Sequence, residues 1–113
     1  MPRSANPEKN RRLKSETSKL RFSAMLWRYQ GAAGWYFVTL PRKLSLAIRS
    51  SHRERARNWG SLGCEATIGT TAWKTSLFPD RAIDAYLLPV KAAVRKRELL
   101  QEGERIQVQV RIL

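Results

Sequence analysis

The chain has a single cysteine, few acidic residues and no long apolar stretch. Its one cysteine, Cys64, excludes a disulfide within the chain and suits a reducing compartment. No stretch approaches the roughly 18 apolar residues that a membrane-spanning helix requires, and the N-terminus lacks the apolar core of a signal peptide. The sequence therefore predicts a cytoplasmic protein that does not insert into a membrane.

The residues on which enzymes and metal sites depend are also scarce. Nucleophilic catalysis needs a base beside the nucleophile and a group that orients this base. Neither Cys64 nor Ser76 has such neighbours, and the only histidine, His52, lies among arginines. A metal site needs several His, Cys or paired carboxylate ligands. We expect no enzyme activity, no catalytic residue, no metal and no cofactor, although spacing alone leaves open a glycosidase-type pair among Glu65, Asp80 and Asp84.

Positive charge is abundant. The chain has 22 Lys and Arg against 9 Asp and Glu, a formal net charge of +13. Residues 1–19 contribute +4 of this, so residues 20–113 are basic in their own right with +9. Such a charge raises association rates with polyanions and also keeps a protein soluble. It is compatible with nucleic acid, an anionic membrane surface or an acidic partner, and equally with a solvated basic surface that binds nothing.

The length of 113 residues fits one small domain with a single core. Residues 1–19 carry many charges, two prolines and no hydrophobic period, which predicts a disordered basic tail. Residues 20–113 hold the patterned sequence and are predicted to form one β-barrel domain.

Six stretches have the alternation or composition of strands. They are Leu20–Tyr29, Trp35–Leu40, Leu62–Ile68, Ala72–Phe78, Asp84–Leu88 and Arg105–Leu113. Trp27 and Trp35 lie in these patterns and are expected to pack in the core, and Pro79-Asp80 is expected to end the fourth strand.

Leu-Pro-x-Lys occurs twice, at Leu40–Lys43 and Leu88–Lys91, each time after a strand pattern. Proline is tolerated in the first turn of a helix, so each copy predicts a helix start. The first helix is expected to reach Trp59, and the second is short, with Gly103 available as its cap. Without a long strand–helix–strand rhythm, this order predicts a mainly β fold, a small six-stranded barrel of two similar halves with two short helices.

Several segments in this order resemble the bacterial domain-of-unknown-function family numbered 1905. They are Gly34–Pro41, Ala66–Thr70, Trp73–Pro79 and Tyr86–Lys91, with Gly103-Glu104-x-Ile106-x-Val108 near the end. The resemblance implies a double-split β-barrel, an architecture shared with swapped-hairpin antitoxin and transition-state-regulator DNA-binding domains, and no established enzyme activity. Those DNA binders are dimers that share one barrel, whereas the two similar halves of this chain favour a monomer.

An arginine stripe supports nucleic-acid binding. Arg49, Arg53 and Arg57 recur every four residues on the polar side of the first predicted helix, with Arg42 before them and Arg55 beside them. Clustered Lys and Arg are what phosphate contacts require. We therefore expect a non-enzymatic barrel that binds a polyanion such as nucleic acid through Arg42, Arg49, Arg53, Arg55 and Arg57.

A second surface supports an alternative. Hydroxyl groups, ammonium and guanidinium groups and an indole are suited to hold a small carboxylate or phosphate. The sequence combines them in Trp73, Lys74, Thr75 and Ser76, together with Lys91 and Arg95. The chain is then a barrel that binds a small anionic metabolite, and a structural or interaction domain without a ligand remains the third possibility.

Overall fold

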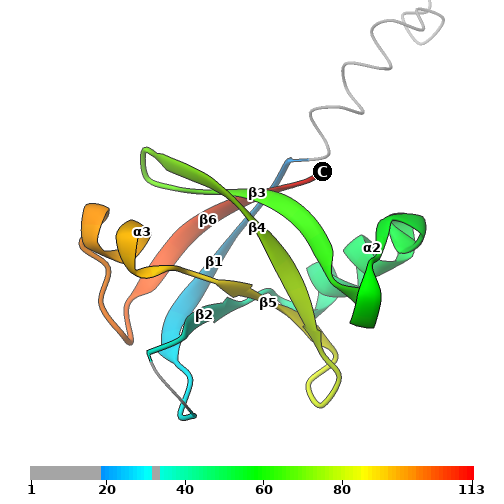
Figure 1. Cartoon of the computed structure of the whole chain (residues 1–113), viewed down its shortest axis with the longest axis horizontal. Coiled ribbons are helices and arrows are strands. Elements are labelled where there is room, and N and C mark those ends of the chain that lie inside the picture. The colour runs from blue at the N-terminus through cyan, green and yellow to red at the C-terminus, as the bar shows by residue number, and fades with distance from the viewer. Residues whose placement is uncertain (1–18, 32–33) are drawn as a thin grey trace, which may run out of the picture.

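The computed structural model describes residues 19–31 and 34–113 (Figure 1). The elements in chain order are β1 Lys19–Arg28, β2 Tyr36–Thr39, α2 Arg42–Ser51, η2 Arg53–Arg55, η3 Asn58–Gly60, β3 Leu62–Ile68, β4 Thr71–Asp80, β5 Ala85–Pro89, α3 Ala92–Arg97 and β6 Arg105–Ile112. The η elements are short 3₁₀ turns. The predicted basic tail lies outside the described residues, apart from Lys19, which begins β1.

The strands form a closed barrel in the order β1-β2-β5-β4-β3-β6. Every neighbouring pair is antiparallel, and β6 closes the barrel because it pairs with both β1 and β3. The helices α2 and α3 lie at opposite sides of the barrel (Figure 1). The prediction of a mainly β, six-stranded barrel with two helices is confirmed for the described part of the chain.

The core is the inside of the barrel. In β1, β3 and β6 alternate residues point inward and are buried, as the period of two requires, whereas β5 is buried at neighbouring positions on both faces. The fully buried side chains include Leu26, Val38, Cys64, Leu77, Leu88 and Val110. Burial raises the pKa of the Cys64 thiol to about 12, so this thiol stays protonated near neutral pH and is a poor nucleophile.

Both copies of the proline motif lie between a strand and a helix, but they are offset by two residues: Pro41 is the N-cap of α2, whereas Pro89 is the last residue of β5 and Lys91 is the N-cap of α3. Leu40 and Val90 are both buried, and each is followed within two residues by the start of a helix. Their backbone N–H groups donate to the opposite strand, Leu40 to the Tyr86 carbonyl and Val90 to the Tyr36 carbonyl, each at 2.9 Å. The two halves are therefore joined through reciprocal bonds between the ends of β2 and β5. The predicted helix start is found at Pro41, whereas the second helix starts only at Ala92, so Pro89 does not stand in its first turn.

The first helix is shorter than predicted, because α2 ends at Ser51 and not near Trp59. Ile48 is the last buried residue of its apolar stripe, and Ala56, one of the next available positions, is exposed. Without an apolar face to bury, a further helical turn gains little packing energy. It would also stack Arg49, Arg53 and Arg57 as like charges.

Two further boundaries differ from the prediction. The strand β4 continues through Pro79 to Asp80. Proline is accepted at position 79 because Tyr86, its register partner on β5, does not need a hydrogen bond from it. The Tyr86 carbonyl accepts from the Leu40 N–H, on the side of β5 that faces away from β4. Gly103, with φ 89°, lies in the turn before β6 and does not cap α3, which ends at Arg97.

Candidate functional site

Two of the five arginines predicted to bind nucleic acid are paired within the protein. Asp84 lies in the turn between β4 and β5, and its carboxylate accepts from Nη1 of Arg49 at 2.8 Å and from Nη2 of Arg42 at 3.4 Å. The structure therefore does not place the predicted residues on one free stripe. Asp84 separates the paired arginines from the unpaired ones. It lies 35 residues from Arg49 in the chain, so no local sequence pattern predicts this contact.

The same contacts act on Asp84. The hydrogen bond and charge of Arg49, with a smaller contribution from Arg42, hold the pKa of this carboxyl below its usual value. A lowered pKa in the folded state means that the ion pairs add stability above the usual aspartate pKa of about 3.9. This stability is lost as the pH falls through the lowered value.

Asp84→Asn is therefore expected to lower the melting temperature at pH 7 by a small amount, because the pairs are exposed. Asparagine tolerates the left-handed backbone at this position, where φ is 54°. The difference between wild type and variant should shrink as the pH falls through the lowered pKa of Asp84, since the protonated aspartate is then as neutral as asparagine. Thermal unfolding followed by circular dichroism at a series of pH values measures this, and a difference independent of pH would contradict the assigned ion pairs.

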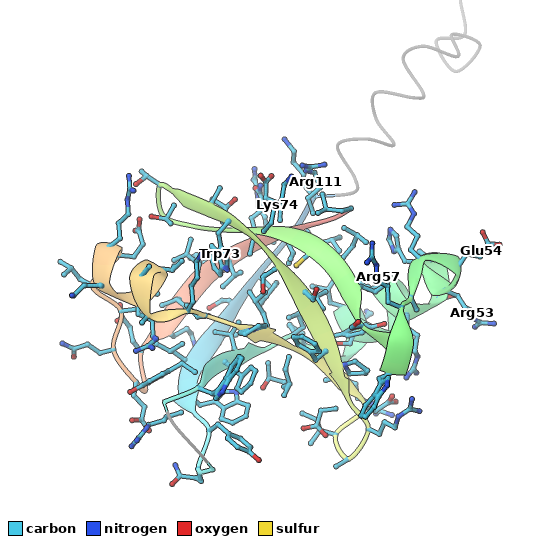
Figure 2. The ribbon with its side chains drawn as sticks, viewed as in Figure 1. Arg53, Glu54, Arg57, Trp73, Lys74 and Arg111 are labelled. Carbon is cyan, nitrogen blue, oxygen red and sulfur yellow. The ribbon has the colours of Figure 1, made fainter. Side chains whose placement is uncertain are left out.

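The other three predicted arginines lie in an irregular segment, residues 52–60, which we call the arginine loop. Arg53 and Arg55 belong to η2, Arg57 follows it, and all three are exposed. Within the described part of the chain, none of the three forms an ion pair or a side-chain hydrogen bond. Figure 2 shows Arg53 and Glu54 at the outer edge of the loop, away from the barrel.

The loop is irregular, but backbone bonds hold it. The N–H of Arg55 donates to the His52 carbonyl at 3.0 Å, that of Arg57 to the Ser61 carbonyl at 2.8 Å, and that of Gly60 to the Arg57 carbonyl at 2.9 Å. These bonds span most of the loop and connect it to the start of β3. The arginines are therefore presented by a backbone with a defined path.

The most exposed aromatic residue, which no sequence pattern singled out as a binding residue, belongs to the same loop. Trp59 is 88% exposed and adopts φ 67°, a left-handed conformation that is uncommon for a bulky side chain. Gly60, with φ 83°, follows it. In the sequence, Asn58-Trp59-Gly60 indicates only the end of the first predicted helix; the available signal was a tryptophan that follows the last apolar residues of that helix and precedes a glycine.

A small cavity of ≈ 260 Å³ lies beneath the loop, between α2 and the turn joining β4 to β5. Arg53 and Ala56 of the arginine loop line it, as do the buried Ser45 and Tyr86. The Ser45 hydroxyl accepts a hydrogen bond from the Tyr86 N–H at 3.0 Å. Burial raises the pKa of the Tyr86 phenol, against the opposing charge of Arg49. The loop thus lies directly beside a packed junction of α2, β4 and β5.

All six residues of the alternative site line one larger cavity of ≈ 660 Å³. We call this cavity the window, because it opens between β4 on one side and the end of β5 with α3 on the other. Its lining includes the predicted residues Trp73, Lys74, Thr75, Ser76, Lys91 and Arg95, together with the aromatic residues Trp35, Tyr36 and Phe78. Trp73 and Lys74 are labelled on β4 in Figure 2.

The charges at the window are positive. None of its lining residues is Asp or Glu. Arg95 is held in place, since its Nε donates to the Val90 carbonyl at 3.1 Å and its guanidinium carbon lies 3.8 Å from the centroid of the Tyr36 ring. Glu65, the residue opposite Lys74 on β3, is bonded instead to Arg111 at 3.2 Å.

The expectation that Trp27 and Trp35 pack in the core is wrong. Trp35 is 54% exposed, precedes β2 and stacks on Phe37 with ring centroids 5.9 Å apart. Trp27 is half-buried and donates from Nε1 to the Thr39 hydroxyl at 2.9 Å. Both belong to an aromatic cluster with Tyr29 on the outside of the β1–β2 hairpin. The apolar pattern was right for β2, whose outward residue Phe37 packs against the rings of Trp27, Tyr29 and Trp35.

Residues 19–31 and 34–113 contain no group of three or more His, Cys, Asp or Glu side chains placed to bind a metal ion. No helix in the described residues combines the length and apolar character needed to cross a bilayer.

These features define a class: a closed antiparallel barrel with a basic loop on one side and a cation-lined window in its wall. The chain belongs to the family described as domain of unknown function DUF1905, whose model matches residues 22–110. The match includes the arginine loop and the whole window, and it confirms the family resemblance drawn from the sequence. No curated protein matches the chain.

Proposed function

We propose that this protein is a non-enzymatic cytoplasmic protein that binds single-stranded nucleic acid through its arginine loop. The observation that carries the proposal is Trp59, which is 88% exposed in a loop with three exposed arginines that have no acidic partner among the described residues. The site differs from the sequence expectation, because Arg42 and Arg49 are bound to Asp84 and Trp59 is added.

The chemistry of the loop matches the chemistry of a single strand. Guanidinium groups bind phosphates and release counterions, which makes the affinity depend on salt. An exposed indole offers a flat surface on which an unpaired base stacks. The bases of a duplex already stack on one another, so Trp59 favours a single strand over a duplex.

Neither side-chain type in the loop is explained by folding. Apolar side chains stabilise a fold when they leave water, and Trp59 remains almost wholly in it. Arg53, Arg55 and Arg57 carry like charges that repel one another, and Glu54 is the only acidic residue between them in the sequence. A surface that lowers stability in this way is expected where a ligand supplies the missing contacts.

Trp59→Ala tests the proposal against a plain solvated loop. We expect it to weaken binding of a fluorescein-labelled 12-nucleotide oligo(dT) or oligo(rU) about 10-fold, since one stacked base contributes about 1–3 kcal/mol. Trp59→Phe keeps a ring and should stay within a few-fold of wild type. Fluorescence anisotropy at 50 mM salt measures both, with melting temperatures as a check on folding. If Trp59→Ala binds as tightly as wild type, or if no oligonucleotide binds, the proposal fails.

The second candidate function is binding of an anionic ligand in the window. It is favoured by one observation, that the six residues expected from the sequence line a single cavity without an acidic residue. The volume of ≈ 660 Å³ lies within the range of about 300–1,000 Å³ typical of ligand pockets. This site and the arginine loop lie on different sides of the barrel, with α3 and α2 respectively (Figure 1).

A further inference from the structure

The strand β4 has a free edge where it borders the window. Its residues Thr71–Leu77 pair with β3 on one side, but pairing with β5 on the other side begins only at Phe78. Beyond this point β5 leads away to α3. A sheet edge of this kind presents unpaired backbone groups to whatever lies next to it.

The register shows which backbone groups face the window. The Gly63 carbonyl accepts from the Leu113 N–H at 3.0 Å, so the backbone groups of Gly63 point towards β6. Ser76 lies opposite Gly63. In an antiparallel pair the residue opposite such a position points the other way, and the direction alternates along the strand. The N–H and C=O of Ser76, and of Lys74 two residues before it, therefore point into the window.

The pairing of β4 with β5 gives the same result independently. Phe78 has the same parity as Ser76 and Lys74, and it is paired with Leu87 of β5 on the window side of the strand. The backbone groups of Pro79, the next residue, point away from β5, so its missing N–H breaks no bond to β5. Two residues, Lys74 and Ser76, thus offer up to four backbone hydrogen bonds at i and i+2.

The window is bounded at both ends. The β4–β5 pairing closes it at Phe78, and at the other end the Glu98 carboxylate after α3 accepts from the Thr71 hydroxyl at 2.5 Å and from the Thr70 hydroxyl at 3.4 Å. At about 3.3 Å per residue, the seven steps from Thr71 to Phe78 span about 23 Å. The far wall is formed by Lys91, Ala92 and Arg95.

We propose that the window binds an extended acidic peptide segment of a partner protein, which adds as a strand to the free edge of β4. The inference rests on the second candidate function and names its ligand. Backbone groups of every second peptide residue pair with Lys74 and Ser76, and acidic side chains lie near Lys74, Lys91 and Arg95. Strand addition obtains affinity from main-chain bonds and specificity from the side chains between them. A small anion would use the cations but leave the edge of β4 bonded only to water.

The test uses a fluorescein-labelled peptide of three Glu-Val repeats and two N-methylated forms of it. One form is methylated on the Glu nitrogens and the other on the Val nitrogens, so that each removes the donors of one edge of the added strand. We expect one form to lose binding about 10-fold or more while the other stays close to the parent peptide. Equal affinities of the two methylated forms would contradict strand addition.

Charge variants locate the site. Lys74→Ala with Lys91→Ala should weaken binding of the parent peptide about 10-fold, whereas Lys43→Ala with Arg81→Ala removes the same charge on the α2 side and should leave binding unchanged. Equal losses in both double variants would indicate attraction by net charge alone and overturn the inference.

Small anions separate this inference from the candidate function on which it rests. We expect citrate and phosphate to compete only weakly with the peptide. If they bind the window tightly and the peptide does not, anionic-ligand binding stands and strand addition fails. If neither the peptide nor these anions bind, both fail.

Discussion

Replacing Arg53, Arg55 and Arg57 together with alanine is expected to weaken binding of a single-stranded oligonucleotide about 100-fold at about 0.1 M salt. Each phosphate contact on a single strand contributes about 0.7 to the slope of log K against log salt, so three lost contacts lower log K by about 2 at this concentration. The slope itself should fall by about 2. Fluorescence anisotropy titrations at a series of salt concentrations measure both quantities.

The matched control removes the same charge elsewhere. Arg28, Lys96 and Arg97 are exposed and lie outside the arginine loop, and they form no ion pair among the described residues. Their triple alanine variant has the same net charge as the loop variant, but its arginine loop is intact. We expect it to bind within a few-fold of wild type. An equal loss in both triple variants would mean that net charge, and not the loop, binds the strand.

Deleting residues 105–113 is expected to unfold the domain. The deleted segment contains β6, which pairs with both β1 and β3 and closes the barrel. It buries four apolar side chains in the core, those of Ile106, Val108, Val110 and Ile112. At about 1.5–3 kcal/mol each, their burial contributes roughly 6–12 kcal/mol, which is comparable with the whole stability of a typical domain, about 5–15 kcal/mol.

Circular dichroism and the dispersion of amide proton signals detect the expected loss of structure. Gln107→Ala serves as the control, because Gln107 is exposed on the same strand and should be replaceable with little change in melting temperature. A truncated chain that still melts cooperatively would show that the barrel does not depend on closure by β6.

The barrel was predictable because its determinants are local. Alternation with period two is written directly into β3 and β6, where every second residue is buried. The helix start at Pro41 was predictable for the same reason, since proline acts on the residues next to it, whereas Pro89 stays in β5 and α3 begins only at Ala92. The window followed from these elements: four of its residues are consecutive on β4, and the pairing of β4 with β5 brings Lys91 and Arg95 opposite them.

The arginine loop was less predictable because tertiary contacts decide it. The distribution of free and paired arginines depends on Asp84, which reaches α2 only once β4 and β5 are paired. Arg49, Arg53 and Arg57 lie on one helical face only if the helix continues to residue 57. Because α2 ends at Ser51, they do not form a single helical stripe. The exposure of Trp59 depends on a left-handed backbone turn, which a tryptophan does not signal.

The most direct test of where nucleic acid binds is a titration of the ¹⁵N-labelled protein with an unlabelled 12-nucleotide oligo(dT), followed by amide and indole chemical shifts. We expect the largest shifts at residues 52–60, with the Trp59 indole among them, and small shifts around Lys74 and Lys91. If the largest shifts fall elsewhere and residues 52–60 stay unchanged, nucleic acid does not bind through the arginine loop.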